Sequence, residues 1–124
     1  MDKFWVWDQS RGVMLDPAGG WFAGGYSGRG DGLNNPAMQH VVSTGPIPQG
    51  WYRIGPLTSS KRTGKNISNL TPLPETNTFG RSAFQLHGDN AKGNRTASSG
   101  CIIMAPAKRI ALINSNVDLL KVVA

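Results

Sequence analysis

The sequence predicts a mainly β protein: one small domain of short strands and turns, with a single helix near its C-terminus. The chain has 124 residues, the length of one ordinary domain, so residues 1–124 are expected to form a single unit. Its 16 glycines and 8 prolines interrupt the chain too often for a helical bundle and favour strands joined by many turns. Hydrophobic residues make up 39% and charged residues 16%, which excludes a disordered chain.

The first elements are a hairpin and a long glycine-rich segment. Residues 4–7 are aromatic and β-branched and predict a strand; a polar turn at 8–12 leads to a returning strand at 13–15. Residues 16–37 hold seven glycines and predict a structured loop that lines a cleft. This loop lacks the Gly-Lys-Ser/Thr ending of a phosphate-binding loop, so no nucleotide site is expected.

The middle of the chain predicts one strand followed by a polar segment. Residues 51–55 follow a rigid Gly/Pro-rich segment and alternate, with Tyr52 and Ile54 on one side of the expected strand. Residues 58–69 are polar and predict a mobile loop. The two prolines that follow them favour an extended or turn-like backbone.

The C-terminal third predicts three strands and the helix. Residues 82–87, 101–104 and 117–123 are the expected strands, and 88–99 is a polar loop. Residues 106–113 begin with proline and carry apolar residues at helical spacing, which predicts a helix. Its apolar stripe is expected at Ala107, Ile110, Ala111 and Ile113.

The net charge of +6 suits a polyanionic partner such as nucleic acid, an anionic membrane face or an acidic wall polymer. The basic residues are dispersed, and the densest cluster, Lys61, Arg62 and Lys65, lies in a polar loop. We therefore expect no nucleic-acid partner. No window approaches the roughly 18 apolar residues of a membrane span.

Cys101 and His87 are the residues most able to carry chemistry. One cysteine excludes an intramolecular disulfide, and with two histidines it offers no ordinary zinc ligand set, so no metal and no cofactor are expected. Thirteen residues separate His87 from Cys101, few enough for their two strands to be neighbours. An imidazole within hydrogen-bond reach would hold the thiol as a thiolate–imidazolium pair. No metal-ligating residues surround His40 in the sequence, so we interpret it as structural.

Small residues precede the cysteine and would let a substrate approach the backbone. The N–H groups around Ser99, Gly100 and Cys101 are candidates for an oxyanion site. The alternative is a buried, inert cysteine, which the apolar run after Cys101 favours.

One pattern in this chain resembles the catalytic signature of the L,D-transpeptidases, the YkuD-type catalytic domain. It consists of a His-Gly pair at 87–88, a polar loop, and Ser-Ser-Gly-Cys-Ile at 98–102. Further segments in the same order resemble the short, effector-type branch that type VI secretion delivers into rival bacteria: Gly25–Gly28, Asn34–Pro36, Gly45–Gly50, Tyr52–Gly55 and Arg81–Phe84. The similarity runs from about residue 4 to about residue 113.

The resemblance implies a YkuD-like β-sandwich or barrel with a helix after the catalytic strand, and a cysteine acyl-transfer enzyme that acts on peptidoglycan stem tetrapeptides. By that analogy Cys101 attacks the carbonyl at the L-centre of the third, diamino residue and expels D-alanine, with His87 as base. The thioacyl-enzyme passes to water, to a free D-amino acid or to another stem. Substrate-binding or supporting residues would be Arg81, Asn90, Ser98 and Tyr26.

The chain also departs from the housekeeping members of that family. Ser99 stands where they have histidine and Ile103 where they usually carry arginine, which removes an expected handle for a substrate carboxylate. The loop between His87 and Cys101 is shorter than theirs. No third triad side chain is evident; Asp89 is poorly placed, and a backbone carbonyl could orient the imidazole instead.

The implied substrate lies outside the cytoplasm, whereas the first eight residues lack the pattern of a secretory signal. We therefore expect a monomer that a contractile secretion machine delivers to the target periplasm, and a small periplasmic immunity protein that covers the cleft.

Two other functions stay open. One is a basic wall-binding module with an inert cysteine, and the other is a cysteine amidase or peptidase that cuts a different wall bond.

Overall fold

The computed structural model describes residues 3–124 and confirms a mainly β fold with one α-helix. The predicted N-terminal hairpin is present: β1 (Trp5–Asp8) pairs antiparallel with β2 (Val13–Leu15). The glycine-rich segment that follows does not form one loop. It contains β3 (Trp21–Gly24), β4 (Tyr26–Ser27) and two short 3₁₀ turns, η1 (Gly30–Gly32) and η2 (Pro36–Met38).

The prediction of a mobile loop over residues 58–69 is wrong. After β5 (Gly50–Ile54), this region forms β6 (Thr58–Ser60) and the long strand β7 (Gly64–Pro72). The side chains of Ile67 and Leu70 are buried, and β7 pairs with β5 on one side and β8 on the other. Burial of two apolar side chains and a double ladder of hydrogen bonds outweigh the polar composition.

The C-terminal elements lie close to their predicted positions. The strands are β8 (Gln85–His87), β9 (Ile102–Ile103) and β10 (Leu119–Val123). The helix α1 (Pro106–Ile113) has the predicted bounds and begins at a proline. β8 is shorter than expected because Ala83 has a positive φ of 64°, which interrupts the extended backbone just before it.

The buried face of α1 differs from the predicted stripe. Ala107 and Ala111 are exposed, whereas Leu112 and the charged Arg109 are buried. Arg109 is accommodated because its guanidinium donates to the backbone carbonyls of Asn66 and Met104. No helix in the described part of the chain is long and apolar enough to cross a membrane.

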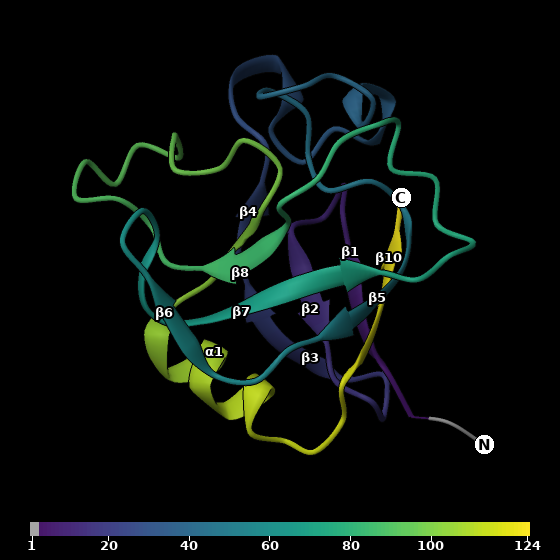
Figure 1. The fold of residues 1–124 in the computed structure, drawn as a ribbon, viewed down its shortest axis with the longest axis vertical. Coiled ribbons are helices and arrows are strands. Elements are labelled where there is room, and N and C mark those ends of the chain that lie inside the picture. The colour runs from purple at the N-terminus through teal and green to yellow at the C-terminus, as the bar shows by residue number, and fades with distance from the viewer. Residues whose placement is uncertain (1–2) are drawn as a thin grey trace.

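The strands form one curled sheet whose two ends meet. Their order is β3-β2-β1-β10-β5-β7-β8-β9-β4, with β6 attached to β7. β3 and β4 lie at opposite ends of this path, yet only Gly25 separates them in the chain, so the sheet bends back on itself. Figure 1 shows β5, β7 and β8 in front of β1, β2 and β3. The mainly β class is therefore confirmed, with the strands in one mixed sheet.

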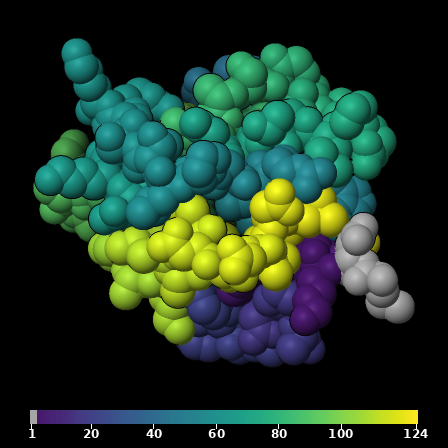
Figure 2. All heavy atoms as spheres, turned by 60° about the horizontal axis from the view of Figure 1, so that its bottom comes forward, coloured from purple at the N-terminus to yellow at the C-terminus, as the bar shows by residue number. Residues whose placement is uncertain are grey.

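The hydrophobic core lies on the inner, concave side of the curled sheet. Trp7 and Tyr52 are completely buried and pack with aliphatic side chains of β8, β9, β10 and α1. Figure 2 shows the C-terminal segment in yellow between the N-terminal hairpin and the central part of the chain, as the pairing of β10 with β1 and β5 requires. This core holds β8 and β9, which carry the candidate site.

Candidate active site

Two neighbouring parallel strands bring His87 and Cys101 together. β8 pairs with β9 so that Leu86 lies opposite Ile102 and His87 opposite Ile103. Cys101 directly precedes β9 and is two residues from Ile103, so it shares a sheet face with His87 as its diagonal neighbour. Both side chains are about 4% exposed. The predicted adjacency of the two segments is present.

The His87 ring is held in one tautomer with a free nitrogen. Nδ1 lies 2.8 Å from the Gly88 carbonyl oxygen. A carbonyl only accepts hydrogen bonds, so Nδ1 carries the proton and the neutral ring presents a lone pair at Nε2. Nε2 is buried and has no hydrogen-bond partner among the described residues. Such an orphaned acceptor suits a base that awaits a proton.

Burial keeps both members of the pair neutral in the free site. It raises the pKa of the Cys101 thiol above its ordinary value, although the N–H of Gln85 and the Arg62 guanidinium act in the opposite direction. Burial also lowers the pKa of His87, against the hydrogen bond to Gly88. Both directions favour the uncharged forms, a thiol and a neutral imidazole, over the expected thiolate–imidazolium pair.

We expect alkylation of Cys101 by iodoacetamide to be slower near neutral pH than in the unfolded chain. The thiolate is the reactive form, and a raised pKa means that it appears only as the pH rises above the ordinary thiol range. The rate in the folded chain should therefore keep rising with pH after that of the unfolded chain has levelled off. Mass spectrometry of the modified chain across a pH series measures both rates. Fast, pH-independent modification near pH 7 would contradict a neutral resting pair.

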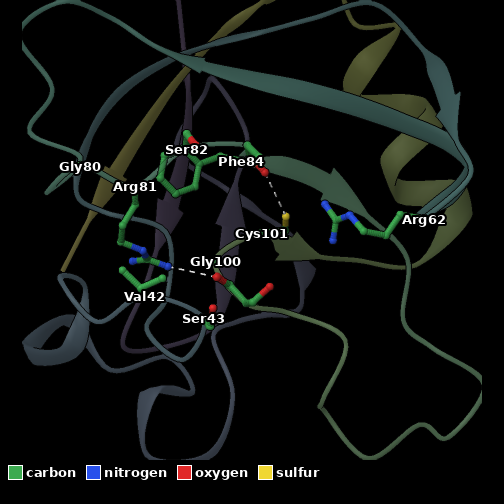
Figure 3. Close-up of a pocket in the computed structure, with 11 residues that line it drawn as sticks. Val42, Ser43, Arg62, Gly80, Arg81, Ser82, Phe84, Gly100 and Cys101 are labelled. Carbon is green, nitrogen blue, oxygen red and sulfur yellow. Dashed lines mark hydrogen bonds between the residues drawn. The ribbon is translucent and has the colours of Figure 1, made fainter.

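The thiol lies in the wall of an open hollow of about 390 Å³, a size typical of ligand sites (Figure 3). His87 lies in the wall of a second hollow of about 230 Å³. Arg62 lines both hollows. The other residues of the first hollow come from three loop segments and are Val42, Ser43, Gly80–Phe84, Ser99 and Gly100.

The turn before Cys101 is fixed by Ser98. The Ser98 hydroxyl donates to the Cys101 carbonyl at 2.6 Å and accepts from the N–H groups of Gly100 and Gly28. Ser98 is 1% exposed, so it positions the turn and has no surface that a substrate could touch. Because the Gly100 N–H is engaged, the N–H groups of Ser99 and Cys101 remain as oxyanion candidates.

Arg81 holds this turn from the other side. Its guanidinium donates to the carbonyls of Gln39, Gly45 and Pro46. It also donates to the carbonyl of Ser99 (Figure 3). The side chain is 8% exposed, and burial lowers its pKa. Gly100 has a φ of +136°, and a Cβ there would lie 2.5 Å from Arg81 Nη2, which explains the glycine. These contacts give Arg81 a positioning role, because its donors are already used within the protein.

The remaining predicted site residues brace the loop after His87. The Tyr26 hydroxyl donates to Asp89 Oδ1 at 2.7 Å and accepts from the Ala97 N–H; burial and this bond raise its pKa to about 12. Asn90 lines the His87 hollow and bonds Thr96 and the backbone of its own loop. Asp89 thus anchors Tyr26, and the Gly88 carbonyl orients the imidazole.

Sequence reasoning missed Arg62 as a site residue because residues 58–69 were expected to be a mobile loop. The turn between β6 and β7 instead places its guanidinium beside Cys101 (Figure 3). His40 is exposed, stacks edge-on with Phe79 and belongs to neither hollow. Among residues 3–124, no group of three or more His, Cys, Asp or Glu side chains could hold a metal ion.

Comparison with known proteins identifies one family. Residues 22–124 match the family model described as the Tlde1 domain. No curated protein and no solved structure gives a match. The matched range includes all the residues that line the Cys101 hollow and the His87 hollow.

Proposed function

Because the chain belongs to the Tlde1 domain family, a family of type VI secretion effectors, we propose that it is an antibacterial cysteine enzyme that acts on peptidoglycan stem tetrapeptides. The observation that carries the proposal is the free Nε2 of His87 on the same sheet face as the Cys101 thiol. A buried, inert cysteine would have no need of an oriented imidazole with an unused lone pair.

The neutral resting pair defines the first chemical step. When the scissile carbonyl carbon approaches Sγ, His87 Nε2 takes the thiol proton as the S–C bond forms. The carbonyl oxygen becomes an oxyanion, for which the N–H groups of Ser99 and Cys101 are the candidates. Collapse of the intermediate breaks the C–N bond, and the imidazolium returns its proton to the leaving D-alanine amine.

The thioester is then resolved by a second nucleophile. His87 takes a proton from water, which gives an L,D-carboxypeptidase, or from the amine of a free D-amino acid, which gives exchange. Attack by the amine of another stem would give a cross-link. Each route returns the thiol and the neutral imidazole to their starting state.

The family supports a proposal for where the protein acts. Type VI effectors are delivered into target cells by the secretion machinery, and such a family implies an immunity partner. We propose that this chain acts in the target periplasm, and that a periplasmic immunity protein covers the hollow beside Cys101.

Product analysis tests the proposed function. Tetrapeptide-rich muropeptides are incubated with the wild-type chain or with Cys101→Ala, each with and without a free D-amino acid, and analysed by mass spectrometry. We expect loss of one alanine, or its replacement by the added D-amino acid, only with the intact thiol. Their ratio separates hydrolysis from exchange.

Two other product patterns would overturn the proposal. Cleavage at the glycan–peptide link would indicate an amidase. An unchanged muropeptide profile together with tight binding to isolated cell walls would indicate a basic wall-binding module, which the net charge of +6 would suit.

A further inference from the structure

Arg62 lies between the two hollows of the candidate site. It lies in the turn between β6 and β7, and it is the one residue that lines both the Cys101 hollow and the His87 hollow. Its side chain reaches across toward the Cys101 sulfur (Figure 3). Its positive charge acts on the titration of both groups, lowering the pKa of each. A guanidinium therefore lies where a bound substrate must meet nucleophile and base together.

This guanidinium forms no ion pair within the described part of the chain, and the side-chain contact that acts on it lies at the Cys101 thiol. The two ion pairs of residues 3–124 are Arg11–Asp8 and Arg53–Asp118, both away from the site. The buried Arg81 and Arg109 donate hydrogen bonds to backbone carbonyls. Arg62 is exposed, and apart from its contact with the Cys101 thiol its N–H donors are available for an anion. No carboxylate lines the Cys101 hollow.

The proposed substrate would bring a carboxylate to this place. In a stem that ends one residue beyond the scissile bond, the terminal carboxylate carbon is two bonds from the scissile nitrogen, about 2.5 Å away. With the scissile carbonyl about 3 Å from Sγ, the carboxylate must lie within roughly 7 Å of the sulfur. A peptide one residue longer would carry it about 3.5 Å further.

From this position we propose that Arg62 binds the terminal carboxylate of the substrate and makes the enzyme specific for peptides that end one residue past the bond it cuts. The assignment rests on the proposed function. A planar guanidinium pairs with both oxygens of a carboxylate at once, which fixes the position of the scissile bond as well as the affinity.

One test does not depend on the natural substrate. Cys101 is alkylated at a single pH with anionic iodoacetate and with neutral iodoacetamide, and the ratio of the two rates is measured. The thiolate fraction cancels in this ratio, so the ratio reports the local attraction for a carboxylate. We expect Arg62→Gln to lower it about fivefold. Lys61→Gln is the matched control: it removes the same charge from the same turn but lines neither hollow, and should leave the ratio unchanged.

The second test uses two peptides. A stem tetrapeptide with a free terminal carboxylate is compared with its C-terminal amide, and release of D-alanine or D-alaninamide is measured. We expect Arg62→Gln to lower kcat/KM for the acid by roughly 10- to 100-fold, mainly through KM. The loss on the amide should be much smaller, because there only the effect of Arg62 on the pKa of Cys101 and His87 is removed. Arg62→Lys should restore part of the preference for the acid.

The outcomes separate the two proposals. An unchanged alkylation ratio, or an equal loss on acid and amide in Arg62→Gln, overturns the role of Arg62. No release from either peptide by the wild type overturns the proposed function, and the alkylation ratio then still decides whether Arg62 recognises carboxylates. Because Arg62 is exposed, the variant should fold with an unchanged melting temperature.

Discussion

Replacing His87 with glutamine should lower the rate of D-alanine release about 10³-fold while leaving the fold intact. Burial raises the pKa of the thiol and so favours its protonated form, which requires a base that takes the proton as the sulfur attacks. The His87 Nε2 lone pair has no partner among the described residues and is the proposed acceptor, whereas an amide cannot accept and return a proton in this way. Initial rates on a stem tetrapeptide, together with thermal melting, measure both effects.

The pH dependence gives this prediction a second readout. His87 loses its basicity when the pH falls through its pKa, which burial places below the ordinary imidazole range. The wild type should therefore keep kcat/KM at pH values where an ordinary histidine would already be protonated, and lose it only at lower pH. His87→Gln should lose this acid limb along with the rate.

His40 provides the matched control for His87. It is exposed and contacts Phe79 outside both hollows, so His40→Gln should leave the rate and the acid limb unchanged. Equal losses in the two histidine variants would contradict the assignment of His87 as the base and would indicate a general effect on folding or substrate access.

The elements with clear local signals were predictable from sequence. The aromatic run of β1, the alternation of β5 and the proline that opens α1 each identify an element of the structure. Segments whose structure depends on pairing with distant parts of the chain could not be predicted from sequence. β7 is polar along most of its length and becomes a strand because β5 and β8 pair with it, which no local pattern reports.

The candidate site shows the same division. The juxtaposition of His87 and Cys101 follows from a short connection between two apolar segments. The roles of the arginines do not follow from sequence. Sequence alone makes Arg81 a candidate substrate-binding or supporting residue, and the fold surrounds it with carbonyls. Arg62 lies in a segment predicted to be a polar loop, and the β6–β7 turn brings it to the thiol. Charge alone does not distinguish an arginine that fixes the backbone from one that faces a ligand.

Replacing Arg81 with methionine should destabilise the protein by about 3 kcal/mol, because the change leaves several buried carbonyls without donors. For a chain of this length, that corresponds to a fall in melting temperature of roughly 10 °C. Arg81→Lys should recover little of the loss, since an ammonium cannot span carbonyls that a flat fork reaches together. Calorimetric or fluorescence melting checks both values.

Arg53→Met is the control for the loss of an arginine. Arg53 is exposed and pairs with Asp118 at 3.1 Å, and exposed pairs contribute about 1 kcal/mol or less, so its melting temperature should hardly change. Arg81 also donates to the carbonyl of Ser99, which lies two residues before the nucleophile in the chain. Arg81→Lys should therefore also alter the alkylation rate of Cys101 at temperatures where the chain stays folded. A variant that melts early but alkylates at the wild-type rate would limit Arg81 to stabilising the fold and would remove it from the positioning of the thiol.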